Sequence, residues 1–167
     1  MIAQIRVDDR LIHGQVALVW TKELNTNRII VANKHAVESD ALRMTLQMGT
    51  PAGQKLLVKD VPDACRIVND PRADSMRIFA LTNCVKDVLE FVKGCPGKIA
   101  GVNVANVGRF DKSDPATKVS LNSTIMLNPE ELEAAKELCE QGIPVFHQLI
   151  PSNPKVPLKD MIEKALK

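Results

Sequence analysis

The sequence contains no tyrosine, one tryptophan and only four phenylalanines among its 167 residues. A core so poor in aromatic rings has to be built from valine, isoleucine, leucine, alanine and methionine. The scarcity also argues against nucleic acid as a partner, because single-stranded nucleic acids are bound by stacking bases on aromatic side chains. No run of about 18 apolar residues occurs, so the chain is not expected to span a membrane.

The four cysteines also lack a functional pattern. Cys65, Cys84, Cys95 and Cys139 show neither CxxC nor metal-finger spacing, and no secretory signal precedes them. We expect reduced, structural thiols in a cytoplasmic protein, with no metal site and no organic cofactor. The net charge of +2 is too small to indicate a polyanionic partner by itself.

Short apolar segments alternate with helical patterns along the whole chain. Apolar residues make up 45% and charged residues 25% of the composition, which suits one globular domain spanning residues 1–167. Periodicity and capping residues predict strands at 2–7, 28–33, 56–58, 77–81, 98–104 and 145–149, and helices at 11–24, 39–49, 62–69, 85–94, 129–142 and from 158 onwards. Residues 108–118 read as a loop or hairpin, before an extended run at 124–127.

Several of these strands are apolar on both faces, as in the run Ile29 to Ala32. Such strands, alternating with amphipathic helices, predict an α/β fold: a doubly wound, mostly parallel sheet with helices on both faces. Ligands of such folds bind outside the carboxyl ends of the strands, at a switch in strand order. The candidate positions are 8–14, 33–35, 59–60, 82–83 and 103–109.

The densest polar cluster is Arg6 to Gln15, at the predicted turn from the first strand into the first helix. An anion there would meet free backbone N–H groups and the positive end of a helix dipole. Arg6 and Arg10 can supply forked donors to phosphate oxygens. The backbone at Gly14 and Gln15 can approach a bound group closely.

His13 is the candidate nucleophile of this cluster. An ordinary imidazole titrates near neutrality, so much of it is uncharged and able to attack phosphorus. Asp8 or Asp9 could hold the proton on the other ring nitrogen. The residues alone also allow a solvated turn with local ion pairs and a histidine that merely packs at a helix start. The sequence contains neither the GxSxG motif of hydrolases nor the GxGxxG motif of dehydrogenases, which argues against both classes of enzyme.

The segment Arg6 to Val16, followed by Trp20, resembles the active-site signature of the mannose/fructose/sorbose family of IIB components of the sugar phosphotransferase system (PTS). The likeness continues at 28–31, 101–104, 118–120 and the helix from Glu130, and so spans most of the chain. The resemblance implies that His13 accepts a phosphoryl group, through Nδ1, from a phosphohistidine on a IIA partner.

The same resemblance implies further roles and partners. His13 would pass the group to a sugar held by membrane IIC and IID partners, so the protein would be a cytoplasmic phosphotransferase associated peripherally with a permease. Arg6, Asp8 and Arg10 would shape the pocket. Thr82 would border it and could donate to a phosphate oxygen, although its hydroxyl could equally cap a helix.

One departure concerns residues 105 and 106, where many members of that family have a glycine pair and this chain has Ala105-Asn106. The loop 107–112 also differs from the common form. Both changes bear on the sugar class and on docking, and neither lies within the His13 motif.

Two other functions remain open from the sequence. A receiver-like signalling domain would use Asp8-Asp9 as its acidic pair, Asp60 as a Mg²⁺-dependent phosphorylation site and Thr82 after the fourth strand. The lysine that such domains place after the fifth strand is missing from residues 103–110. A ligand-binding or regulatory module without transfer activity would need none of this chemistry.

Overall fold

The computed structural model describes residues 1–167 and is organised around a seven-stranded sheet with the order β3-β2-β4-β1-β5-β8-β9. Its strands are β1 (Ile2–Asp8), β2 (Arg28–Ala32), β3 (Lys55–Lys59), β4 (Ile78–Thr82), β5 (Val102–Asn106), β8 (Val145–His147) and β9 (Val156–Pro157). Neighbouring strands are parallel except for β8 and β9. A separate hairpin pairs β6 (Val119–Ser120) with β7 (Met126–Leu127).

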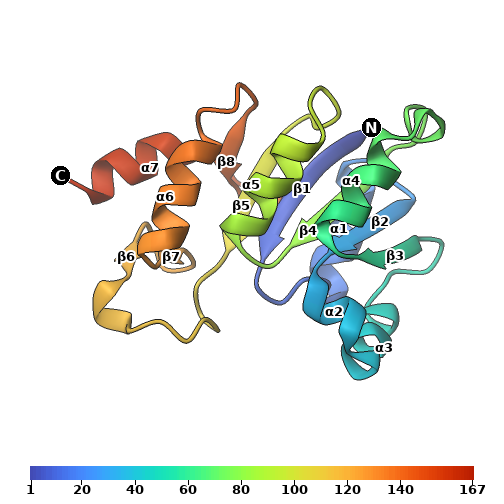
Figure 1. Cartoon of the computed structure of the whole chain (residues 1–167), viewed down its shortest axis with the longest axis horizontal. Helices are drawn as coiled ribbons and strands as arrows, with labels where there is room; N and C mark the ends of the chain where they lie inside the picture. The colour runs from blue at the N-terminus through green and yellow to red at the C-terminus, as the bar shows by residue number, and fades with distance from the viewer.

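Helices cover both faces of the sheet, as predicted. One face carries α1 (Gly14–Glu23), α2 (Lys34–Glu38) and α3 (Asp40–Met48), whose buried side chains share one apolar cluster. The other face carries α4 (Val61–Asn69), α5 (Val85–Gly94), α6 (Pro129–Leu138) and α7 (Leu158–Ala165), which share a larger cluster. In Figure 1, α5 crosses in front of β1, and α7 lies at the opposite end of the molecule from α3.

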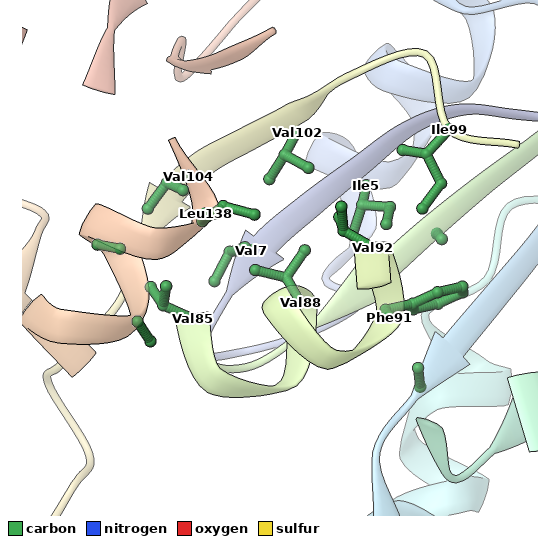
Figure 2. Close-up of a cluster of buried hydrophobic side chains, with 14 of the residues drawn as sticks. Ile5, Val7, Val85, Val88, Phe91, Val92, Ile99, Val102, Val104 and Leu138 are labelled. Carbon is green, nitrogen blue, oxygen red and sulfur yellow. The ribbon is translucent and has the colours of Figure 1, made fainter. Parts of the chain in front are cut away.

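The central strand β1 has one apolar and one polar face. Ile5 and Val7 pack in the larger cluster, against the valines and Phe91 of α5 (Figure 2). Side chains alternate along a strand, so Arg6 and Asp8 point to the other face, where both are buried. β1 is therefore not apolar on both faces, unlike β2, and it carries charge into the interior.

The predicted helices and strands are present, with several changes at their ends. The expected caps hold, because the Ser39 and Asn128 side chains accept from backbone N–H groups at the starts of α3 and α6. The sequence patterns do not predict α2, which Asn33 caps, or the antiparallel strand β9. They also start the fifth strand too early, since residues 98–101 form a connection that touches β1 through an isolated bridge at Ile99.

The α5 helix is capped by a carboxylate from another helix. Its own N-cap residue, Cys84, makes no side-chain capping bond. Instead the buried Glu131 of α6 accepts from the backbone N–H groups of Val85 (2.8 Å) and Lys86 (2.7 Å). Burial raises the pKa of Glu131, and the two N–H donors oppose that shift. One carboxylate thus joins two helices on the same face of the sheet.

Replacing Glu131 by alanine should lower the free energy of unfolding by about 1–3 kcal/mol, because one buried and one partly buried N–H group lose their acceptor. Urea denaturation measures this loss. The control is Glu130→Ala, which removes only an exposed ion pair with Lys86 and should change stability by less than about 0.5 kcal/mol. Equal losses in the two variants would contradict the capping role.

Candidate functional site

A tight turn follows β1 and replaces the first helical turn that the sequence predicted. The N–H of Leu11 donates to the backbone carbonyl of Asp8 (2.8 Å), and the N–H of Arg10 donates to Asp8 Oδ1 (3.0 Å). Leu11 has a φ of 57°, a left-handed conformation that costs a non-glycine residue about 1–2 kcal/mol. The helix consequently begins at Gly14 rather than at residue 11.

Asp8 is the centre of the site. Its side chain is 0% exposed, and its Oδ2 lies 3.4 Å from Arg6 Nη2, 3.2 Å from Asn106 Nδ2 and 3.5 Å from His13 Nε2. Its Oδ1 accepts from the N–H of Arg10. A buried carboxylate needs such partners to remain ionised. The predicted association of Arg6, Asp8, Arg10 and His13 is therefore present in the structure.

The two arginines occupy different environments. Arg6 is buried, stacks 5.7 Å from the Trp20 ring centroid and donates to the carbonyl of Leu149 (3.2 Å), which also accepts from Trp20 Nε1 (3.2 Å). Burial lowers the pKa of Arg6, and Asp8 opposes this. Arg10 is 41% exposed, with its Nε 3.6 Å from Asp8 Oδ1. Only Arg10 can therefore meet a group arriving from solvent without rearrangement.

The His13 ring has one buried edge and one open edge. Its Nε2 is buried, faces Asp8 Oδ2 at 3.5 Å and makes no hydrogen bond of normal geometry, whereas 29% of the side chain is exposed. A ring nitrogen that faces a carboxylate carries the proton, which leaves the lone pair on Nδ1. Burial lowers the pKa of His13, Asp8 opposes that shift and Arg10 reinforces it. The net lowering of the pKa favours a neutral ring, and the contact of Nε2 with Asp8 favours the tautomer in which Nδ1 carries the free lone pair.

The start of α1 is left free for an anion. His13 is its N-cap residue, in an extended conformation (φ −141°, ψ 122°), and makes no side-chain capping bond. The N–H groups of Gly14 and Gln15 have no backbone partner, and the space in front of Gly14 is open, since a Cβ at this position would meet no atom within 4 Å. Free N–H groups at a helix start bind anions well.

A second loop is fastened to the site by Arg109. Its backbone N–H and Nε each lie 3.2 Å from Asp9 Oδ2, and its Nη2 donates to Asp9 Oδ1. Gly108 holds this loop against β7: its φ is +98°, and a Cβ there would lie 1.8 Å from the Met126 carbonyl oxygen. Beside the loop is a hollow of about 330 Å³, lined in part by Asp9, Asn83 and Phe110.

Two predicted residues lie apart from this arrangement. Thr82 is fully buried, and its hydroxyl donates to the carbonyl of Cys84 (3.2 Å), so it offers no donor at the surface beside His13. Asp60 follows β3 at the edge of the sheet, separated from β1 by β2 and β4, and its carboxylate caps α4. The acidic cluster of a receiver-like site is therefore not assembled.

Sequence reasoning missed the parts of the site that come from distant segments. Asn106, Arg109 and the Leu149 carbonyl contact the Arg6–His13 cluster, and only the first two lie within the strand-end positions that the sequence indicates. For Asn106 and Arg109, the sequence offers one indication, which is their place after the predicted fifth strand. No local pattern indicates that their side chains turn toward β1.

Comparison with known proteins places the chain in a family. Residues 2–167 match the model described as PTS system sorbose subfamily IIB component. A probable phosphotransferase enzyme IIB component of Streptococcus pyogenes is 53% identical over 163 residues, covering 97% of this chain and 99% of that protein. The mannose-specific EIIAB component of Escherichia coli is 34% identical over 98% of this chain and 49% of its own length.

A solved structure agrees with these sequence matches. The IIBSor domain of the sorbose permease from Klebsiella pneumoniae superposes with a TM-score of 0.87 and 30% identity, over 98% of this chain and 97% of that one. The fold is that of a phosphotransferase-system IIB component. The chain belongs to the sorbose subfamily of PTS IIB components. None of its helices has the length and hydrophobicity needed to cross a membrane.

Removing the carboxylate of Asp8 should be far more damaging than removing that of Asp9. Asp8→Ala leaves the buried Arg6 without its counter-charge and should lower the free energy of unfolding by about 3–5 kcal/mol. In Asp9→Ala the freed Arg109 is partly exposed and can be solvated, so the loss should be about 1 kcal/mol or less. Chemical denaturation of both variants checks this order, and similar losses would contradict it.

Proposed function

We propose that this IIB component carries a phosphoryl group on Nδ1 of His13, between a phosphorylated IIA donor and a sugar. The single observation that supports this most strongly is the orientation of the ring. Its Nε2 lies against the buried Asp8, while the opposite edge is open at the uncapped start of α1. A solvated turn would not require a buried carboxylate behind the histidine, nor a helix start without a cap.

In the accepting step, the Nδ1 lone pair attacks the phosphorus of the donor's phosphohistidine. The new P–N bond forms as the donor's P–N bond breaks, and the proton on Nε2 stays beside Asp8. Transfer of this kind is loose and needs positioning and charge neutralisation rather than further covalent chemistry. Arg10 and the N–H groups of Gly14 and Gln15 are placed to neutralise the phosphoryl oxygens.

In the releasing step, a sugar hydroxyl oxygen attacks the phosphorus, the P–Nδ1 bond breaks and its electron pair returns to the imidazole. Because Nε2 keeps its own proton, the proton of the sugar hydroxyl leaves to solvent. The buried Arg6 does not contact the phosphoryl group. Its role is to hold Asp8 in position through the hydrogen bond between the two side chains. The arginine and helix-start donors supply positive charge, so no metal or organic cofactor is assigned a role.

We infer the partner proteins from the family and from the relatives described above. The E. coli relative is a mannose-specific EIIAB component, in which this chain matches about half of the length. We infer a IIA protein or domain as donor, with membrane IIC and IID subunits presenting the sugar at the cytoplasmic face of a permease. The open edge of His13 lies at the carboxyl ends of β1 and β5, which is where these partners would have to reach.

The first test is intact mass measured at alkaline pH after incubation with a phosphorylated IIA donor. Wild type should gain one phosphoryl group that is stable to alkali, as a phosphoramidate is, and His13→Ala should gain none. His35→Ala is the matched control, because His35 is exposed on α2 and should not change the result. Modification of His13→Ala that is seen at neutral pH, is lost in alkali and is absent from Asp60→Ala would instead indicate an acyl phosphate and overturn the proposal.

A second prediction separates the two arginines. Arg10→Ala should slow phosphoryl acceptance about 10- to 100-fold, since it removes a charged donor from the transferring group. Its free energy of unfolding should change by less than about 1 kcal/mol, because the side chain is partly exposed. Rapid-quench kinetics measure the rate, with Arg72→Ala as the exposed-arginine control. An Arg10→Ala rate equal to that of the control would exclude a direct role.

A further inference from the structure

Asn106 is drawn into the site by an irregularity between β1 and β5. Val7 pairs with Val104, but the next residue, Asp8, pairs with Asn106, so Ala105 is an extra residue in β5. Bulges of this kind redirect side chains and are frequent near active sites. Here the backbone carbonyl of Asn106 accepts from the N–H of Asp9 (2.9 Å), and its buried amide Nδ2 donates to Asp8 Oδ2 (3.2 Å).

The acceptor of that hydrogen bond is the same oxygen that faces the histidine. Asp8 Oδ2 lies 3.5 Å from His13 Nε2 and 3.4 Å from Arg6 Nη2. An oxygen that already accepts from an amide and a guanidinium has less negative charge to offer to a third donor. The long contact to Nε2 fits this sharing, since a hydrogen bond between an N–H and a carboxylate is ordinarily about 2.7–2.9 Å.

We propose that Asn106 is a positioning residue that limits how strongly Asp8 holds the Nε2 proton of His13, and thereby favours release of the phosphoryl group. Its effect on transfer rests on the proposed role of His13. Its effect on the histidine itself does not, and can be measured without any phosphoryl donor.

The chemistry gives the direction of the effect in both half-reactions. A carboxylate that binds the Nε2 proton tightly makes the imidazole more electron-rich, which improves Nδ1 as a nucleophile and makes it a poorer leaving group. An amide that occupies the same oxygen moderates both effects. Asn106 would therefore shift the exchange equilibrium with the donor away from the loaded carrier and speed transfer onward to the sugar.

The first experiment is an NMR titration of the His13 ring in the full chain. The charged groups around the ring are Asp8, Arg10 and Arg6, and none of them is altered in Asn106→Ala or Asn106→Gly. Both variants free Asp8 Oδ2 to accept from Nε2. The midpoint pH of the His13 titration should therefore rise above that of wild type. Asn33→Ala is the matched control, because it removes another buried strand-end amide, which caps α2 and makes no hydrogen bond to a residue of the site.

The outcomes of the titration decide the proposal. A raised midpoint in the folded Asn106 variants, with the Asn33→Ala midpoint unchanged, supports it. A midpoint equal to wild type in either folded Asn106 variant overturns it, and so does an equal rise in Asn33→Ala, which would reveal only a general loosening. Amide spectra recorded on the same samples establish that each variant is folded.

The second experiment measures phosphoryl exchange with a phosphorylated IIA donor. Removing the amide should shift the equilibrium toward the loaded carrier about threefold to tenfold, as expected for part of a hydrogen bond to a charged group. Discharge to the acceptor should slow by a similar factor. If His13 carries no phosphoryl group in wild type, the proposed function is wrong. The titration still tests whether Asn106 affects the pKa of His13. An unchanged equilibrium in a protein that is phosphorylated on His13 would overturn the role in release.

Discussion

The buried contact between Arg6 and Asp8 is the constraint on which the site depends. Two opposite charges on the inner face of a central strand are tolerable only if each is fully partnered, since an unpaired buried charge costs several kcal/mol. Asp8 takes its partners from β1, the following turn and β5, and Arg6 takes a carbonyl from the segment after β8. Three separate segments are therefore held around His13 by one electrostatic requirement.

The turn that carries His13 lacks a stabilising contribution that most helix starts of this chain have. Four other helices begin at a side chain that caps them, worth about 1 kcal/mol each, whereas α1 begins at an uncapped histidine. Leu11 adds the cost of a left-handed conformation three residues after Asp8. Strain and free N–H groups concentrated in one turn are what an anion-binding site requires, because the bound group can then supply the missing partners.

Local patterns predicted the layers of the fold but not the course of this turn. β2 and β4 are apolar on both faces and α6 has a complete capping signal, so propensity and burial agree there. Leu11 and Ile12 fit a helical stripe equally well, yet they are buried in the turn, where Ile12 packs against Gly49 at the end of α3. Burial does not distinguish a helix face from a buried turn. The contact of Asn106 depends on a bulge that no local pattern encodes.

Strand order also decides between chemistries that the sequence leaves equal. Asp8, Asp60 and Thr82 all follow strands, and a sheet that placed β3 beside β1 would have gathered them as an acidic phosphorylation site. In the observed order, β4 and β5 are the neighbours of β1, so Asn106 and Arg109 approach the turn while Asp60 stays at the edge capping α4. The residues at strand ends can be read from the sequence, but only the order of the strands determines which of those ends meet.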